Sequence, residues 1–380
     1  MSRILYVQYT NPAGYPPLEH SSRLLADMGW QVLFAGTGAL GAATLRFPPH
    51  DRIAVRQIAY SRSGWRQKLH YARFVLWVFA LALRWRPRWI YASDHLACPV
   101  ALLLSYLPGQ HVIYHEHDSP TAGTDDGLFQ QMVLAARRHL ARRAALCVLP
   151  NQQRAERFAQ ETGRSQTVLC VWNCPSQREV TGQQSDAPAE DLWVLYHGSI
   201  VPARLPFTVL DALKQLPANV KLRVIGYETL GHQGYVRKLQ QRADQLDIKE
   251  RIEFVGSVPQ RADLLTLARQ CDVGLALMPK QSADLNERTM TGASNKPFDY
   301  LACGLALLVS DLPDWRQVFV QPGYALACES DEPESIARAL RWFLDHPSEM
   351  REMGQQGHKK IETEWNYETQ FAKVKQQLCD

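Results

Sequence analysis

The sequence lacks several patterns that would indicate a particular class of protein. Its eight cysteines include no C-x-x-C pair and mostly lie inside apolar runs, which is typical of reduced core residues in a cytosolic protein. The chain starts with Met1-Ser2-Arg3 and then enters a strand-like apolar run, so we expect no secretory signal. Neither a disulfide framework nor a zinc site built from cysteines is therefore predicted.

The loop after the first strand pattern also lacks the G-x-G-x-x-G sequence of dinucleotide-binding proteins, so a nicotinamide or flavin cofactor is not supported. The net charge is only +4 and no nucleic-acid motif accompanies the basic residues, so we expect no nucleic acid partner. What the chain does have is size and apolar content. Its 380 residues, 46% of them apolar, can bury a large core in about two or three domains.

Apolar runs of strand length alternate with segments of helical periodicity along most of the chain. A strand at 4–7, a helix at 18–28 and a strand at 31–35 form the first βαβ unit of a doubly wound sheet. The alternation resumes at residue 192 and predicts a second parallel sheet. The fold class is therefore α/β, with two Rossmann-like domains.

Between the two alternating regions, residues 173–191 lose the apolar periodicity and are rich in Ser, Gln and Glu. This composition predicts a linker. The predicted domains are then residues 1–172 and 192–365.

The stretch from Ser294 to Val309 carries the strongest local signal. Ser294 or Asn295 can cap a short helix, Gly304 can end it in a left-handed conformation, and an apolar strand follows. The backbone N–H groups at the start of this helix, together with Lys296, can bind a phosphate. Asp299 can accept hydrogen bonds from ribose hydroxyls. The alternative is a capped helix with a solvated lysine and an aspartate that compensates the helix dipole.

The sequence SNKPFDYLACGLALLVSD resembles the donor-binding segment of glycosyltransferase family 4, whose members have the GT-B fold of two Rossmann-like domains facing a central cleft. The resemblance implies that Lys296 is a catalytic residue at the diphosphate, with Ser294, Asn295 and Pro297 beside it, and that Asp299 binds the ribose. The family often carries an acid pair spaced E-x7-E. Here Thr291 stands where the first acid, which usually contacts the donor sugar, would be.

A second segment, after the strand at 192–196, is similar to the family's G-R-x-x-x-x-K-G turn, in which two cations clamp the diphosphate. Arg204 matches the lysine, whereas Ser199 replaces the arginine. A plain surface role for Arg204 is the alternative. The resemblance implies that further donor contacts come from Gly198, Gly226, Tyr227, Gly256 and Ser257.

The cluster His115-Glu116-His117-Asp118 follows a predicted strand in the first domain, at the end where open α/β sheets bind ligands. We do not predict a metal site, because adjacent residues of an extended segment point in opposite directions and no second cluster completes a shell. The resemblance implies that His117 and Asp118 contact the transferred sugar or the acceptor, and that the loop at Gly14 faces the donor phosphates. Local hydrogen bonding at a strand end is the alternative.

Residues 62–89 combine seven basic residues with an apolar core at 74–83, and no acidic residue lies between Asp51 and Asp94. The apolar part is shorter than the roughly 20 residues that span a bilayer. It could lie in a membrane interface, where basic and aromatic side chains meet lipid headgroups. The alternative is a helix packed within the domain whose arginines extend outward.

Taken together, the resemblance implies a retaining glycosyltransferase of the hexosyltransferase type. It would move a sugar from a UDP or GDP type donor to a glycan, lipid-linked or small-molecule hydroxyl, with no bound cofactor and no metal requirement. The resemblance also implies that a terminal helix at about 366–380 packs back on the first domain. We expect a cytoplasmic protein, with peripheral contact at the inner face of the membrane as an option. A nucleotide-sugar epimerase of the same fold and a non-catalytic sugar-nucleotide-binding protein remain alternatives.

Overall fold

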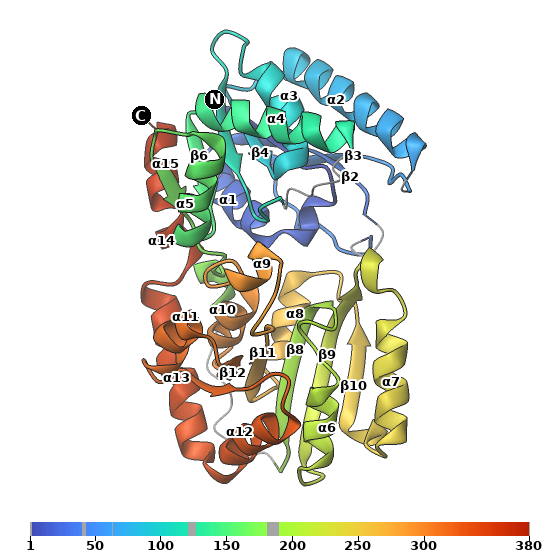
Figure 1. Cartoon of the computed structure of the whole chain (residues 1–380). Helices are drawn as coiled ribbons and strands as arrows, with labels where there is room; N and C mark the ends of the chain where they lie inside the picture. The colour runs from blue at the N-terminus through green and yellow to red at the C-terminus, as the bar shows by residue number, and fades with distance from the viewer. Residues whose placement is uncertain (1, 40–42, 63, 121–126, 181–189, 380) are drawn as a thin grey trace. The chain divides into compact units, whose positions relative to one another are not determined.

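The computed structural model describes residues 2–39, 43–62, 64–120, 127–180 and 190–379, and the chain divides into two compact units (Figure 1). Unit 1 comprises Met1–Asn173 and Tyr367–Asp380, and unit 2 comprises Cys174–Asn366. Part of the predicted linker, residues 181–189, lies outside the described residues.

Unit 1 contains a seven-stranded parallel sheet with the order β3-β2-β1-β4-β5-β6-β7. The order reverses between β1 and β4, so the carboxyl ends of these two strands form the switch point at which doubly wound sheets bind ligands. The strands are β1 (Arg3–Val7), β2 (Gln31–Thr37), β3 (Ile53–Ile58), β4 (Trp89–Ser93), β5 (His111–His115), β6 (Leu146–Leu149) and β7 (Val168–Cys170).

Helices cover both faces of this sheet, and each face has its own apolar cluster. On one face, Phe74 and Val78 pack with Leu5 and Leu33; on the other, Leu18 and Leu25 pack with Tyr6 and Phe34. The helical segments are η1 (Pro12–Gly14), α1 (Pro16–Asp27), α2 (Trp65–Trp85), η2 (His95–Ala97), α3 (Cys98–Leu104), α4 (Leu128–Arg143) and α5 (Gln152–Thr162).

The last segment of the chain belongs to unit 1. It contains helices α14 (Tyr367–Gln370) and α15 (Ala372–Cys379), with Phe371 between them, and it buries Tyr367, Phe371 and Val374 in the same cluster as Leu18. The C-terminal residues thus pack on one face of this sheet, although they are far in sequence from its strands.

Unit 2 contains a six-stranded parallel sheet with the order β10-β9-β8-β11-β12-β13, and its switch point lies between β8 and β11. The prediction of two parallel-sheet α/β domains is therefore confirmed. The strands are β8 (Leu192–Ile200), β9 (Val220–Glu228), β10 (Ile252–Gly256), β11 (Val273–Ala276), β12 (Ala306–Ser310) and β13 (Ala325–Cys328).

Helices pack along the sheet of unit 2, and α10 begins at Asn295 as the sequence predicts. Gly304 adopts a φ of 79° directly after this helix, which agrees with the predicted left-handed stop. The helical segments are η3 (Gln177–Glu179), α6 (Thr208–Lys214), η4 (Leu230–His232), α7 (Tyr235–Gln245), η5 (Lys249–Arg251), α8 (Arg261–Ala268), α9 (Leu285–Arg288), α10 (Asn295–Ala302), α11 (Pro313–Trp315), the π-helical η6 (Arg316–Val320), α12 (Pro333–Asp345) and α13 (Pro347–Thr363).

One predicted feature of unit 2 is wrong in detail. The sequence predicts that the strand ends at Tyr196 and that a glycine turn follows, but β8 continues to Ile200 because β9 pairs with it up to Glu228. Gly198 and Ser199 are therefore the end of a strand, held by ladder hydrogen bonds. The helix that follows, α6, starts only at Thr208.

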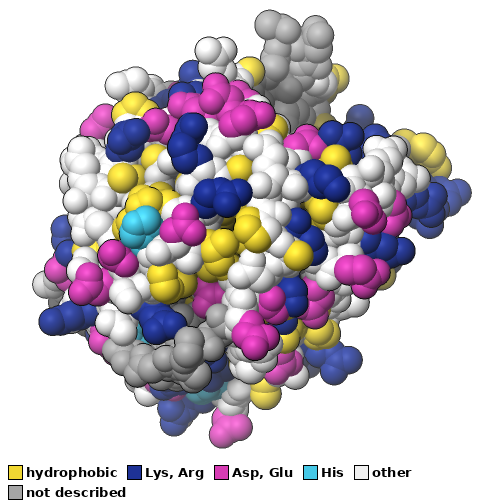
Figure 2. All heavy atoms as spheres, turned by 90° about the horizontal axis from the view of Figure 1, so that it is seen from below, with side chains coloured by type: hydrophobic (Ala, Val, Ile, Leu, Met, Phe, Trp, Pro, Cys, Tyr) yellow, Lys and Arg dark blue, Asp and Glu magenta, His cyan; other side chains and the backbone are white. Residues whose placement is uncertain are grey.

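On the molecular face in Figure 2, basic and acidic side chains are interspersed, with small apolar areas between them. This face shows no broad area of one charge sign, in keeping with the small net charge of +4.

Candidate functional site

Two glycines bring the carboxyl ends of β8 and β9 unusually close together. Gly198 pairs in register with Gly226, which has a φ of 154°. A Cβ atom on Gly226 would lie 1.8 Å from the carbonyl oxygen of Gly198, so no other residue fits there without movement of the backbone. The predicted donor residues Gly198, Ser199, Gly226 and Tyr227 thus lie together at the carboxyl edge of this sheet.

Lys296 reaches the same place from the first turn of α10. A Cβ atom on Gly198 would lie 3.3 Å from the Nζ atom of Lys296, and the ammonium lies 5.5 Å from the centre of the Tyr196 ring. The side chain is buried. Burial, and next the positive charge of Arg204, hold the pKa of Lys296 well below its ordinary value.

No hydrogen bond or ion pair to the Lys296 ammonium is found in the part of the chain that the structure describes. A buried cation without a paired acid is costly unless an anion from outside occupies the site. The cation-π contact with Tyr196 offsets only part of that cost, because such contacts contribute about 0.5–2 kcal/mol.

Arg204 lies in the segment that connects β8 to α6 and points back at the strand end. Its guanidinium donates a hydrogen bond to the Ser199 hydroxyl over 3.1 Å, while its buried Nε has no partner among the described atoms. Burial raises the pKa of Tyr227, and the charge of Arg204 partly counteracts that rise. Ser199, which replaces the expected arginine, therefore helps to orient the remaining one.

The surroundings of Asp299 differ from what the sequence suggests. Both carboxylate oxygens accept hydrogen bonds from Arg261, at 2.5 and 3.1 Å, and the Nε2 atom of His197 lies 3.4 Å away. The same guanidinium binds Glu179 at 2.6 Å. The ribose role of Asp299 stays a prediction, and Arg261 is a residue that sequence reasoning missed.

The start of α10 offers backbone donors rather than a capped end. Ser294 occupies the N-cap position and is buried, but its side chain forms no capping hydrogen bond. Asn295 and Lys296 follow in the first turn, and Pro297 is buried within it. The Ser294 side chain thus does not cap the N–H groups of this turn, and the start of a helix is a position that favours anions.

Thr291, which stands where the family's first acid would be, contacts an acid from another segment. The Thr291 hydroxyl donates a hydrogen bond to the carboxylate of Asp314 over 2.5 Å. Asp314 belongs to α11, directly after β12, and is partly exposed. No local pattern in the sequence links these two residues, because they are 23 positions apart.

Gly256 and Ser257, the predicted base contacts, lie at the end of the edge strand β10. Gly256 has a φ of 81°, and the register between β10 and β9 shifts just before it. This bend redirects the chain at Ser257 toward α8. The contact of these two residues with the base stays a prediction.

In unit 1, His117 follows β5 at the carboxyl edge of the sheet. It is buried, neither ring nitrogen has a hydrogen-bond partner among the described atoms, and its ring centre lies 3.9 Å from that of His115. Burial lowers the pKa of His117 to about 4, so the ring is neutral at pH 7. Asp118 is largely exposed, with its carboxylate 3.9 Å from Arg154.

Asp94, directly after β4, orients this segment and was not among the predicted site residues. Its carboxylate accepts hydrogen bonds from the backbone N–H groups of His117 and Asp118, at 2.8 and 3.4 Å. Burial raises the pKa of Asp94 to about 7, with a further contribution from Asp118. Its φ of 61° is rare for a residue other than glycine, and such strain is concentrated at functional sites.

Two other residues of unit 1, Glu116 and Gly14, make local contacts. Glu116 points away from His115 and His117 and forms a buried ion pair with Arg137 at 2.5 Å. Gly14 ends the short helix η1, where its N–H donates to the carbonyl of Asn11. Within the described residues, no group of three or more His, Cys, Asp or Glu side chains could hold a metal ion.

Three solved structures that are similar to this chain align over nearly its full length. Anabaena Alr3699/HepE, in complex with UDP and glucose, has a TM-score of 0.74 at 19% identity, with 100% of both chains covered. Sucrose-phosphate synthase from Thermosynechococcus elongatus has a TM-score of 0.70 at 14% identity, covering 100% of this chain and 98% of that one. WaaG, described as a glycosyltransferase involved in lipopolysaccharide biosynthesis, has a TM-score of 0.67 at 12% identity, with 98% of both chains covered.

The protein has a GT-B fold. Residues 177–360 match the family model of glycosyl transferases group 1. In this GT-B chain, the match covers most of unit 2 and includes Lys296, Arg204 and Asp299. No curated protein matches the sequence of the chain.

Proposed function

We propose that this protein is a glycosyltransferase that moves a sugar from a nucleotide diphosphate sugar to an acceptor hydroxyl. The observation that carries the proposal is the buried ammonium of Lys296, which has no acidic partner within ion-pair distance in the described structure and lies near Arg204. A diphosphate would supply the missing negative charge. The match of residues 177–360 to glycosyl transferases group 1 supports this assignment.

The reaction must stabilise the negative charge that builds up on the departing diphosphate. Lys296, Arg204 and the N–H groups at the start of α10 would bind that charge in a site fixed before the reaction, where such donors are most effective. Gly198, Ser199, Gly226 and Tyr227 would let the phosphates approach the sheet edge. Asn295, Ser294 and Pro297 would shape the helix start.

We infer a UDP type donor before a GDP type one, because Alr3699/HepE is described in complexes with UDP, with UDP-glucose, and with UDP and glucose. Gly256 and Ser257 would lie at the base and Asp299 at the ribose. Family 4 membership, a hexosyl donor and retention of configuration are part of the proposal. They rest on the resemblance of the Ser294–Val309 stretch.

His117 and Asp118 would contact the transferred sugar or the acceptor, and Gly14 would face the donor phosphates. A neutral His117 can accept a hydrogen bond from a hydroxyl at one nitrogen and donate one at the other. Asp94 would hold the His117 segment in place. The acceptor class is a glycan, a lipid-linked sugar or a small molecule.

We also propose peripheral contact between α2 and an anionic membrane at the cytoplasmic face. One side of α2 is buried against the sheet through Phe74, Val78 and Leu81. The opposite side exposes Trp65, Leu69, Leu76 and Leu83 together with Arg66, Lys68, Arg73 and Arg84. Among the described residues, no helix is long and apolar enough to cross a membrane.

The departures at Ser199 and Thr291 favour one alternative, a protein that binds sugar nucleotides without transferring the sugar. The deciding experiment measures binding of UDP, GDP, ADP and their sugar conjugates by calorimetry, followed by product analysis with and without acceptors. Binding of one nucleotide and transfer of its sugar support the proposal. Binding without turnover over many acceptors supports the alternative, and conversion of the sugar without any acceptor indicates an epimerase.

A further inference from the structure

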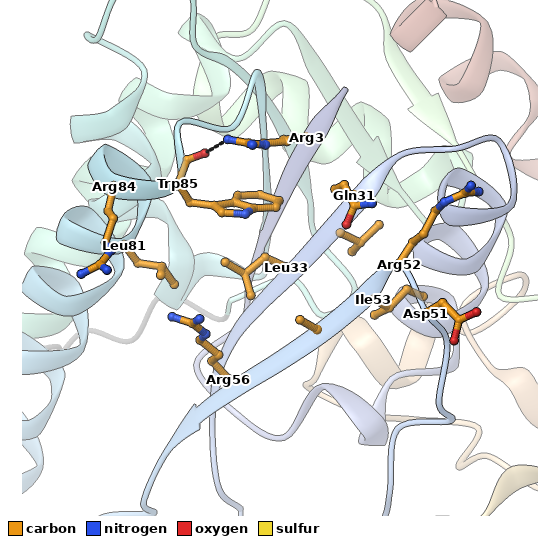
Figure 3. A pocket seen from close by; sticks show the side chains of 12 residues that line it. Arg3, Gln31, Leu33, Asp51, Arg52, Ile53, Arg56, Leu81, Arg84 and Trp85 are labelled. Carbon is orange, nitrogen blue, oxygen red and sulfur yellow. Dashed lines mark hydrogen bonds between the residues drawn. The ribbon is translucent and has the colours of Figure 1, made fainter. Parts of the chain in front are cut away.

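Unit 1 has a pocket of about 420 Å³ (Figure 3). It lies beside the amino ends of β1, β2 and β3, whereas His117 follows the carboxyl end of β5. Its walls come from the first residues of β1, β2 and β3, from the segment just before β3, and from the last turns of α2. The lining residues are Arg3, Gln31, Val32, Leu33, Asp51, Arg52, Ile53, Ala54, Arg56, Leu81, Arg84 and Trp85.

The pocket exists because α2 does not cover the edge strand of the sheet. Helix α2 packs on the inner strands, where Phe74, Val78 and Leu81 meet Leu5 and Leu33. The middle of β3, residues 54–57, stays exposed. The space between the helix and this edge strand has an apolar floor formed by Leu33, Leu81 and Trp85.

The rim of the pocket is strongly basic. Four arginines and one acid line it, which gives an excess of three positive charges. Arg3 donates a hydrogen bond to the carbonyl of Trp85 over 2.8 Å, and Arg52 donates one to the carbonyl of Ala26 over 3.3 Å. These two guanidinium groups are thus held in place by the backbone.

Arg56 and Arg84 differ from the other two. Within the described residues neither guanidinium group has a hydrogen bond or an ion pair, and Figure 3 shows both side chains on the same side of the pocket, away from Asp51. Two positive charges at the opening of one pocket repel each other, and a bound anion would offset that repulsion. A guanidinium prefers phosphate and carboxylate oxygens because it can donate two parallel hydrogen bonds to them.

We propose that this pocket is a second anion site, which binds a phosphate ester whose organic part lies on the floor formed by Leu33, Leu81 and Trp85. Arg56 and Arg84 bind the phosphate, while Arg3 holds Trp85 in position. The ligand comes either from solution or from a lipid headgroup, because α2 contributes both to the pocket and to the exposed basic surface. The site goes beyond the proposed transfer reaction, since its residues belong to unit 1 and lie beside the amino ends of strands, whereas His117 follows the carboxyl end of β5.

The test measures binding of phenyl phosphate and inorganic phosphate by calorimetry, and of phosphatidylcholine vesicles with and without phosphatidylglycerol by sedimentation. The double variant Arg56→Ala/Arg84→Ala removes the two unpaired cations. Its matched control, Arg88→Ala/Arg138→Ala, removes two exposed arginines of unit 1 that do not line the pocket. Ala54→Phe fills the pocket and leaves every charge in place.

We expect the native protein and the control to bind phenyl phosphate more tightly than inorganic phosphate, and the double variant to lose about tenfold or more in affinity. Ala54→Phe should lose a comparable amount. If only vesicles with phosphatidylglycerol bind, with the same order among the variants, the ligand is a lipid headgroup. Equal binding by the control and the double variant, or no binding of any probe, overturns the proposal. Binding of UDP depends on Lys296 and not on the pocket. If the transfer proposal is correct, the double variant therefore binds UDP as tightly as the native protein, whatever the result for the pocket.

Discussion

The carboxylate of Asp299 lies 2.5 Å from the guanidinium of Arg261, and that guanidinium also lies 2.6 Å from Glu179. Both acids and the arginine are largely removed from water, and Asp299 is only 1% exposed. Arg261 thus forms ion pairs with acids from two segments that are 120 residues apart in sequence, because Glu179 belongs to η3 and Asp299 to α10. The network fixes α10, and with it Lys296, against the start of unit 2.

Replacing Asp299 by Asn should lower the free energy of unfolding by about 2 kcal/mol, because it removes two charge-assisted hydrogen bonds from Arg261, which keeps only Glu179 as an acidic partner. Urea denaturation measures this. Asp263→Asn is the matched control, since Asp263 lies on the same helix as Arg261 but is exposed. A loss no larger than that of the control would contradict the role of the network. Nucleotide binding to Asp299 variants must therefore be measured well below their melting temperature.

The same ion pair predicts a loss of stability in acid. Burial alone would raise the pKa of Asp299, but the charge of Arg261 and the hydrogen bonds of His197 and Arg261 hold it below its ordinary value. A carboxyl group with a lowered pKa in the folded state stabilises the fold above the ordinary pKa. That stabilisation disappears as the pH falls through the lowered one.

Replacing Lys296 by Ala should reduce turnover by roughly 100-fold, a typical effect of removing one group that stabilises developing negative charge. Stability should stay the same or increase, because the native ammonium is buried without a paired acid among the described residues. Lys238→Ala, which removes an exposed lysine of α7, is the control. Steady-state kinetics and thermal denaturation are measured on both variants. Unchanged turnover in Lys296→Ala would refute the phosphate role.

Nucleotide binding should also depend on pH through Lys296. Burial and Arg204 lower its pKa in the free protein, whereas a bound diphosphate favours the charged ammonium. Affinity for UDP should therefore fall as the pH rises through the lowered pKa, and binding should take up protons in that range. Calorimetry in two buffers with different ionisation enthalpies measures this uptake, which should disappear in Lys296→Ala.

The two buried histidines of unit 1, His115 and His117, predict a loss of stability between pH 6.5 and about 4. Burial lowers the pKa of His117 to about 4 and that of His115 well below its ordinary value. In this range the unfolded chain binds protons that the folded chain does not, so stability rises with pH. Urea denaturation of the native protein and of His117→Gln across this range checks the sign. The variant should show a shallower dependence, and an unchanged slope would contradict the assignment.

Replacing Asp314 by Asn should weaken binding of the sugar nucleotide about tenfold while leaving binding of the free nucleotide unchanged. The reason is that Asp314 accepts a hydrogen bond from Thr291, which stands at the position of the missing family acid. Asp345→Asn, at the exposed end of α12, is the control. Calorimetry with both ligands gives the answer. An equal effect on both ligands would show that Asp314 acts on the fold rather than on the sugar.

The α/β class could be predicted from the sequence because buried parallel strands are continuous apolar runs, as in the run that became β12. The edge strand β3 could not be predicted, since its middle residues, 54–57, are exposed and include Arg56 and Gln57. The extension of β8 to Ile200 was also missed. It depends on the pairing of Gly198 with Gly226, a contact between residues 28 positions apart.

By itself, the sequence determined the local conformations: the helix at Asn295, the left-handed stop at Gly304 and the alternation that builds two sheets. These follow from the preferences of neighbouring residues. Only the tertiary structure decided which charged side chains have an ion-pair partner. Arg261 forms ion pairs with two acids, and Glu116 forms one with Arg137. Lys296 and Arg56, in contrast, have no acid within ion-pair distance in the described chain. The partner of a charge is set by which distant segments pack together, and the local pattern of residues does not contain that information.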